Sequence, residues 1–385
     1  MKQGWEIKKL GDITTSINGL WTGKKPPFIT IAVIRNTNFT KDCKLDTSDI
    51  AYIDVEVKQY AGRKLQCGDI IIEKSGGSDK QPVGRPILFN IEEGEYSFSN
   101  FTSTLRVSDK TTILPEFIHR YLAYIYMRGG TAAMQSKTTG IRNLDFNLYK
   151  SINIPIPPRE EQEKIVAELD CLSGIIERKR EQLRELDALA QSIFYQMFGD
   201  PITNEKGWET CELQKVSTLL NGRAYKQNEL LDEGKYKVLR VGNFFTNSNY
   251  YYSDLELEPE KYCDDGDLLF AWSASFGAFI WNGGKVIYHY HIWKVLYDKQ
   301  KLNIDYYRFL LNTMTAYFMK DVHGIGMVHL TKAGMEQYIL PIPPLTLQQE
   351  FADKIEAIEK QKELIKKTIS ETETLFNARM DYYFN

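Results

Sequence analysis

Two stretches of the sequence place apolar residues at alternating intervals of four and three, each over about four and a half heptads. The first stretch runs from Ile165 to Met197 and the second from Phe351 to Tyr383. This is the a/d spacing of a coiled coil, and it predicts two helices of roughly 35 to 40 residues that pack against each other. The seam positions are Ile165, Leu169, Leu172, Ile176, Leu183 and Leu186 in the first helix and Phe351, Ile355, Ile358, Ile365, Ile369 and Phe376 in the second.

Each predicted helix follows a proline-rich junction, Ile/Leu-Pro-Ile-Pro-Pro, at residues 154–158 and 340–344. Proline fixes an extended entry and then permits a helix to begin, and a glutamine follows at Gln162 and Gln348. Other motifs recur in the same order in both halves, which predicts an internal duplication. The matching motifs are Gly4-Trp5-Glu6 with Gly207-Trp208-Glu209, Asn18-Gly19 with Asn221-Gly222, Ile34-Arg35 with Leu239-Arg240, and Gly68-Asp69 with Gly266-Asp267.

The segments outside the two helices alternate short β-rich runs with turn clusters and contain one amphipathic helix each, a pattern typical of α+β domains. We expect a domain over 1–158, a helix over 159–200, a second domain over 201–344 and a second helix over 345–385. The first helix must carry the chain from one domain to the other, so the second helix pairs with it in the opposite direction. The predicted fold is therefore α+β, with two domains joined by a long antiparallel two-helix coiled coil and related by a pseudo-two-fold axis.

The formal net charge of −3 would argue against a nucleic-acid partner if charge were evenly spread. It is not, because 1–158 carry +5, 159–200 carry −4, and 201–344 and 345–385 carry −2 each. Loops that combine cations, glycines and amides are suited to phosphate contact and base-edge hydrogen bonding. The candidate DNA-binding residues from such loops are Lys24, Lys25, Arg35, Lys74, Ser75, Lys80, Arg85, Lys137, Arg142 and Asn143 in the first domain and Arg223, Tyr225, Lys226, Arg240, Trp272, Ser273, Ser275, His323, His329 and Lys332 in the second.

The sequence contains no catalytic set, Walker-type phosphate loop, dinucleotide fingerprint or amino-methyltransferase motif. His289 and His291 would share one face of a strand, but no third ligand stands at metal spacing, so we predict no metal site. The 5 cysteines are far apart, which indicates a reducing compartment, and no apolar run approaches the roughly 18 residues of a membrane span. Without a signal peptide, we expect a cytoplasmic protein.

These motifs together resemble the specificity subunits of type I restriction-modification systems, the HsdS family. The resemblance covers the whole chain and rests on the two Gly-Trp-Glu openings, the closing elements at 140–144 and 326–330, and the two proline-rich junctions with their glutamine-bearing helices. It implies two target recognition domains, each reading one half of a bipartite DNA sequence, and two conserved spacer helices.

The resemblance also implies partners, namely double-stranded DNA, two adenine-N6 methyltransferase subunits and, where the system includes one, a restriction/translocase subunit. This chain would bind no cofactor, since S-adenosylmethionine, ATP and Mg²⁺ would belong to the partner subunits. The second copy departs from the first in lacking an acidic residue such as Glu161 before its glutamine, and in having His329 where the first has Asn143. We expect these differences to affect partner contacts or base reading.

If the helix pair sets the unread gap between the half-sites, inserting four residues near Arg180 adds about 6 Å and lengthens the gap by about two base pairs. Alternatives remain open at this point. The chain could serve a related system with a fused methyltransferase-nuclease, or it could be a non-DNA structural scaffold with the acidic helices as a spacer. Because its only basic segment is 1–158, we expect the isolated chain to bind DNA weakly.

Overall fold

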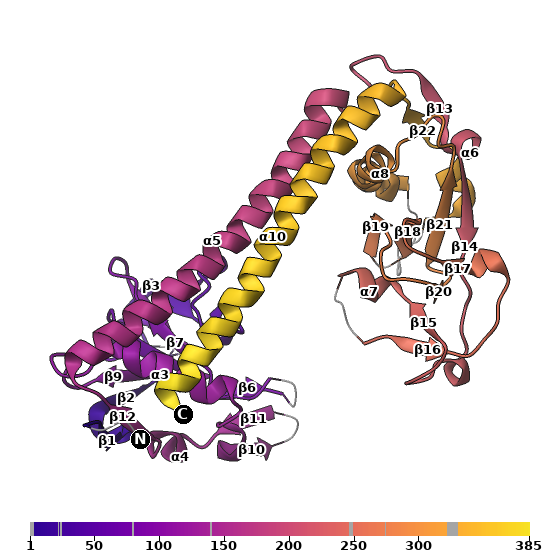
Figure 1. Cartoon of the computed structure of the whole chain (residues 1–385). Helices are drawn as coiled ribbons and strands as arrows, with labels where there is room; N and C mark the ends of the chain where they lie inside the picture. Colours follow the sequence, from indigo (N-terminus) through magenta and orange to yellow (C-terminus); the bar gives the residue numbers. More distant parts are fainter. Residues whose placement is uncertain are drawn as a thin grey trace. The chain divides into compact units, whose positions relative to one another are not determined.

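The computed structural model describes residues 4–21, 23, 25–78, 81–138, 141–245, 249–273, 275–321 and 330–385 (Figure 1). Contacts divide the chain into two units, Met1–Arg178 with Ile369–Asn385, and Lys179–Thr368. The helices α5 (Arg159–Phe198) and α10 (Leu345–Phe384) are each continuous and each shared between the units. The four segments expected from the sequence therefore do not coincide with these two units, because each unit takes half of each long helix.

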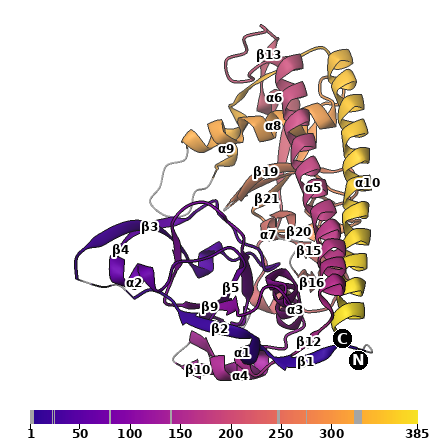
Figure 2. The ribbon, with the colours of Figure 1, turned by 90° about the vertical axis from the view of Figure 1, so that its left-hand side faces the viewer.

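The first unit contains a sheet in the order β2–β9–β5–β7 and a second in the order β4–β3–β8, in which β3 and β8 run parallel. Figure 2 shows β3 and β4 as a long ribbon next to the short helix α2. The helix α3 (Pro115–Met127) packs against β5 and β7 through Phe117, Ile118 and Leu122. The strands are β2 Thr14–Asn18, β3 Phe28–Ile34, β4 Ala51–Glu56, β5 Asp69–Glu73, β7 Pro86–Phe89, β8 Tyr96–Phe98 and β9 Thr102–Val107.

Smaller elements complete this unit. The strand β1 (Glu6–Lys9) pairs with β12 (Asn153–Ile156), and a short sheet runs in the order β10–β11–β6. The remaining bounds are β6 Ser75–Gly77, β10 Gln135–Thr138, β11 Ile141–Leu144, α1 Leu10–Ile13, α2 Val57–Ala61 and α4 Phe146–Lys150, with single 3-10 turns at Asn36–Asn38 and Ala132–Met134.

The second unit repeats this plan with a sheet in the order β14–β21–β18–β19, a sheet in the order β16–β15–β20–β17 and the strand pair β13–β22. The helix α8 (Ile304–Phe318) packs against β19. The other bounds are β13 Thr210–Glu212, α6 Leu213–Val216, β14 Ser217–Asn221, β15 Tyr236–Leu239, α7 Val241–Phe245, β16 Tyr251–Ser253, β17 Tyr262–Cys263, β18 Leu268–Ser273, β19 Ser275–Ile280, β20 Val286–Tyr288, β21 Ile292–Tyr297, α9 Lys332–Glu336 and β22 Ile339–Pro341, with 3-10 turns at Gln227–Glu229, Pro259–Lys261 and Met319–Asp321.

Backbone hydrogen bonds confirm the duplication and fix which residues correspond. The Lys74 N–H donates to the Phe101 carbonyl at 2.8 Å, and the Trp272 N–H donates to the His291 carbonyl at 3.1 Å. Lys74 thus corresponds to Trp272, and Phe101 to His291. The equivalent positions carry side chains of different chemistry on the same backbone frame.

The repeated Asn-Gly and Gly-Asp motifs have structural roles. A Cβ on Gly19 would lie 1.9 Å from the Ser99 carbonyl oxygen, so this close backbone approach requires glycine. Asp69 binds Arg106 through both carboxylate oxygens at 2.7 Å, and Asp267 pairs with Lys294 at 2.6 Å. Each aspartate therefore holds the start of a buried strand against its neighbour.

The helices α5 and α10 pack together, as the heptads predict, and they run antiparallel, as the order of the segments predicts. In the first unit Glu168 of α5 accepts from Arg379 of α10 at 2.8 Å, and in the second unit the rings of Phe194 and Phe351 lie 5.7 Å apart. At the C-terminal end of α5 the buried position is Phe198, one residue beyond the expected Met197. A straight helix of 3.6 residues per turn drifts against a seven-residue repeat, and this drift accounts for the difference.

The glutamines that follow the two proline-rich junctions are fully buried and make the same three hydrogen bonds. Gln348 Oε1 accepts from the Asn303 N–H at 2.8 Å, and its Nε2 donates to the carbonyls of Lys301 and Pro343 at 2.9 and 2.8 Å. Gln162 binds the Leu114 N–H and two carbonyls in the same way. Each glutamine joins the start of a long helix to the loop that begins α3 or α8.

Replacing Gln348 with Met should lower the free energy of unfolding by about 2–4 kcal/mol, because each backbone group left without a partner costs about 1–3 kcal/mol. Urea unfolding measures this loss. Gln349→Met is the matched control, since Gln349 is exposed and should cost less than about 1 kcal/mol. Equal destabilisation by both variants would contradict the role assigned to Gln348.

Glu161 makes a contact within this chain. Its Oε2 accepts from the Trp5 indole at 3.2 Å. In the second copy the corresponding Trp208 indole donates instead to the Phe198 carbonyl at 2.8 Å. The missing acidic residue before Gln348 is therefore matched by a different contact within the chain.

No helix in the described part of the chain is both long and apolar enough to cross a membrane.

Candidate nucleic-acid interface

A polar cluster in the first unit joins three of the predicted DNA-binding residues. The Lys74 ammonium donates to Asn18 Oδ1 at 2.9 Å, and the Ser75 hydroxyl donates to Asn143 Oδ1 at 2.6 Å. Asn36 Nδ2 donates to the Ser75 carbonyl at 2.6 Å. We call these five residues the Lys74 cluster. Its ammonium, hydroxyl and amide groups are the kinds that contact phosphates and base edges.

The short sheet β10–β11–β6 positions this cluster. Asn143 stands opposite Ser75 across β11 and β6, and Arg142 stands opposite Lys137 across β11 and β10. Partial burial lowers the pKa of Lys74, although it does not remove the side chain from solvent. Among the other candidates of this unit, Lys25 is exposed, while Lys24 and Lys80 lie outside the described residues.

Arg35 and Arg240 occupy equivalent turns whose asparagines are structural. The Arg35 N–H donates to Asn38 Oδ1 at 2.9 Å, and the Arg240 N–H donates to Asn243 Oδ1 at 2.8 Å. Both asparagines are buried. The Arg35 guanidinium lies 3.7 Å from the exposed carboxylate of Asp49, so its charge is partly balanced within the chain.

The prediction that Arg85 contacts DNA is wrong. Its side chain is 3% exposed, and its guanidinium lies 3.1 Å from the equally buried Glu73. It also donates to the carbonyls of Phe39 and Thr40 at 2.8 and 3.2 Å. Arg85 therefore fastens a loop to β5 and leaves no accessible cation for a phosphate.

Replacing Arg85 with Met should lower the free energy of unfolding by about 3–5 kcal/mol, because it leaves the Glu73 carboxylate buried without its partner. Burial already raises the pKa of Glu73, which favours its protonation once the cation is gone. The double variant R85M/E73L should recover much of the loss in urea unfolding. If R85M instead weakened DNA binding at unchanged stability, the structural role would be wrong.

In the second unit, Arg223 is engaged within its own loop. Its guanidinium makes two hydrogen bonds of 2.8 and 2.9 Å to Glu229 and lies 5.2 Å from the centre of the Tyr225 ring. Hydrogen bonds from Arg223 lower the pKa of Glu229 to about 2. Lys226 is exposed next to this pair. Of these residues, Lys226 is the most accessible to a phosphate.

An aromatic cluster of the second unit occupies the position that corresponds to Lys74. The Trp272 indole donates to the Tyr290 carbonyl at 2.9 Å, and its ring stacks on Trp293 with centroids 5.4 Å apart. His291 meets the same indole edge-on at 5.2 Å. These residues and Lys332 line a cavity of about 350 Å³. Its aromatic rings, imidazole and ammonium offer stacking and hydrogen bonding to a base.

The sequence suggested that His289 and His291 lie on a strand. The structure places them instead in the turn between β20 and β21. Their ring centroids are 4.8 Å apart. Burial, with smaller contributions from His291 and Arg240, lowers the pKa of His289 to about 4, so this ring is neutral at pH 7. Within the described ranges, no group of three or more His, Cys, Asp and Glu side chains could hold a metal ion.

The remaining candidates of the second unit differ in accessibility. Ser273 is buried at the end of β18, which argues against direct base contact, whereas Ser275 is half-buried. His323 and His329 lie outside the described residues. Sequence reasoning overlooked Asn18 and Asn36, although the repeated Asn-Gly pair marked the first of them.

Comparisons with known proteins identify what the chain is similar to. Residues 2–187 and 205–374 match a family model described as the type I restriction modification DNA specificity domain. The putative type I restriction enzyme MjaX specificity subunit of Methanocaldococcus jannaschii is 22% identical over 95% of this chain and 91% of its own length. The type I restriction enzyme EcoKI specificity subunit of Escherichia coli is 26% identical over 70% of this chain and 61% of its own length.

Two solved structures share the fold. A chain from work on complex assembly and conformational transition of the type I R-M system has a TM-score of 0.57 and 17% identity, covering 100% of this chain and 98% of that one. The type I restriction-modification S subunit from M. genitalium has a TM-score of 0.54 and 11% identity, covering 99% and 97%.

Proposed function

This chain belongs to the type I restriction modification DNA specificity family, and from that premise we propose that each of its two units reads one half of a bipartite DNA sequence. It is the DNA specificity subunit of a type I restriction-modification system, and the recognition role of such a subunit is non-catalytic.

The two-half-site proposal rests on equivalent positions in the backbone that the two units repeat. The first unit presents Lys74 where the second presents Trp272, and Phe101 where the second presents His291. Hydrogen-bonding and stacking groups discriminate bases by type and position. Two frames with the same backbone and different side chains are suited to reading two different short sequences.

Within each unit, we assign phosphate contact to exposed or half-buried cations and base reading to the Lys74 cluster and the Trp272 cavity. Lys25 and Arg142 in the first unit and Lys226, Arg240 and Lys332 in the second would position the duplex. The Lys74 cluster and the Trp272 cavity would contact base edges in the major groove. This division follows the general separation of positioning contacts from specifying contacts.

We infer that methylation and cleavage chemistry lie in partner subunits. Two adenine-N6 methyltransferase subunits would bind S-adenosylmethionine, and a restriction/translocase subunit, where the system includes one, would use ATP and Mg²⁺. Part of the positive surface around the DNA would then come from those partners, which agrees with the near balance of charge in this chain.

Methylation mapping tests this function. The chain is expressed with its methyltransferase partner in a host without adenine methylation, and methylated adenines are located across the genome. We expect one two-part sequence with an unread gap, and loss of that pattern when this chain is omitted. Random methylation, or a pattern independent of this chain, would favour the scaffold alternative. The co-purified partner distinguishes separate subunits from a fused methyltransferase-nuclease.

A further inference from the structure

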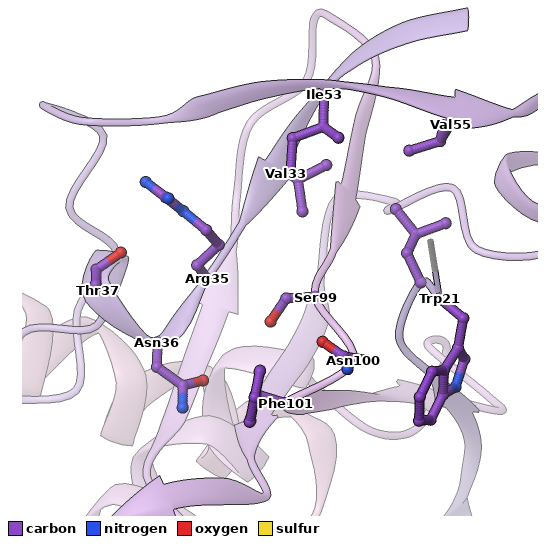
Figure 3. A pocket seen from close by; sticks show the side chains of 11 residues that line it. Trp21, Val33, Arg35, Asn36, Thr37, Ile53, Val55, Ser99, Asn100 and Phe101 are labelled. Carbon is purple, nitrogen blue, oxygen red and sulfur yellow. The ribbon is translucent and has the colours of Figure 1, made fainter. Parts of the chain in front are cut away.

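A pocket in the first unit is lined by residues of β3 and β4 and of the loops beside them, and it shares Asn36 with the Lys74 cluster. Its volume is about 360 Å³, within the range of roughly 300–1,000 Å³ found for small-molecule sites. Leu20, Val33 and Val55 supply an apolar wall, and all three belong to one buried cluster. Figure 3 shows Val33, Ile53 and Val55 on one side of the space.

Two aromatic side chains lie on the other side of this pocket. Trp21 is 65% exposed and Phe101 is 47% exposed, although large apolar rings are usually buried. Figure 3 shows Trp21 and Phe101 on the side of the space opposite Val33, Ile53 and Val55. A planar apolar group placed between them would cover surface that the chain leaves in water.

The residues that line this pocket also carry polar atoms that have no partner in the described structure. Arg35 Nε, Asn36 Oδ1 and Ser99 Oγ are buried and have no hydrogen-bond partner among the described residues. Buried polar groups in folded proteins are nearly always paired. Two of these residues are otherwise held in place, since Asn36 donates to the Ser75 carbonyl and Arg35 pairs with Asp49. A donor, an acceptor and a hydroxyl on residues that line the pocket thus have no partner in the described structure.

The second unit provides an internal comparison. Parallel bridges join Leu20 to Ser99 in the first unit and Arg223 to His289 in the second, so Ser99 corresponds to His289. In the second unit, Tyr225 packs into the cluster equivalent to the apolar wall, and its ring stacks on His289 with centroids 6.4 Å apart. The second unit therefore covers this wall with its own aromatic ring, whereas the described residues of the first unit leave it open at the pocket.

We propose that the pocket of the first unit binds a single nucleobase, turned out of the DNA that this unit reads. The base would stack against Trp21 and Phe101 and use its polar edge to satisfy Arg35, Asn36 and Ser99. Every base carries adjacent donors and acceptors on a planar ring, and stacking with edge recognition is how everted bases are held. Asn36 connects the pocket to the Lys74 cluster, which would contact the edges of the neighbouring bases. That the base comes from DNA rests on the proposed function. That the pocket can bind a base rests only on the residues that line it.

The first experiment uses the full chain and a single-stranded thymine oligonucleotide with one central 2-aminopurine, with binding followed by fluorescence anisotropy. W21A and F101A should each weaken binding roughly tenfold, because base stacking on an aromatic ring is lost. S99A should also weaken it at unchanged stability, since it removes a hydroxyl with no partner among the described residues. Y52A is the control, because Tyr52 is 71% exposed on the opposite face of β4 from Ile53 and should bind as wild type. Wild-type binding by W21A, F101A and S99A alike would overturn the proposal.

The second experiment separates the pocket from the proposed function. The duplex found by methylation mapping carries 2-aminopurine at each position of the first half-site in turn, in the complex with the methyltransferase partner. We expect the fluorescence to change at one position only, and this change to be lost in W21A. Sequence-specific methylation with no responsive position would overturn eversion into this pocket while the proposed function stands. Pocket-dependent binding of the single strand without any sequence-specific methylation would support the pocket and reject the function.

Discussion

A chain whose residues 5–150 come from a relative should direct methylation to a sequence altered in one half only. The candidate base-reading residues of the first unit, including Lys74, Ser75 and Asn143, all fall within this segment. Those of the second unit lie elsewhere in the chain, and in the described structure the strands of that unit pair only with one another. Methylation mapping of the hybrid measures both halves in one experiment.

The structure defines what the hybrid must preserve. The strand β1 in the exchanged segment pairs with β12 outside it, and Phe384 of α10 packs against Phe117, Tyr121 and Tyr124 of α3. A relative with apolar or aromatic residues at these three α3 positions should therefore fold on this helix pair. The converse exchange of residues 208–336 is the matched control and should alter only the other half. A change in both halves from either exchange would contradict independent reading.

The helices and the duplication could be predicted from the sequence because each rests on many residues that agree. The seam residues Leu169 and Ile355 are buried as expected, and antiparallel packing follows from the order of the segments. The sequence showed a glutamine after each proline-rich junction, but it did not show that this side chain joins the long helix to a distant loop. Its three hydrogen bonds reach the loop before α3 or α8, and contacts between distant segments are not encoded in local spacing.

The site was predicted less well because residue type does not reveal burial. Arg85 and Lys74 both occur in a polar glycine-rich stretch, yet Arg85 is buried against Glu73 and Lys74 reaches Asn18 at the surface. The deciding fact is that Glu73 ends a fully buried strand. Conversely, the local sequence pattern does not single out Trp21 or Phe101. Only the fold leaves them exposed beside a pocket.

Inserting four residues into both α5 and α10 at the division between the units should lengthen the unread gap by about two base pairs. Four residues add about 6 Å to a helix, and base pairs are spaced by about 3.4 Å. Suitable points are after Arg178 in α5 and after Thr368 in α10. A four-residue insertion is a stutter that the a/d seam accommodates by local unwinding. Methylation mapping reports the gap directly, and both half-sites should stay unchanged.

The insertion must be made in both helices because both pass from one unit to the other. An insertion near Arg180 in α5 alone is opposed by the unchanged length of α10, whose Met380 and Phe384 are buried in the core of the first unit. The single insertion should therefore pull these side chains out of the core and lower the free energy of unfolding, without a defined lengthening of the unread gap. Urea unfolding and mapping of the two variants in parallel separate these outcomes. A stable double-insertion chain with an unchanged gap would show that the helix pair does not set the spacing.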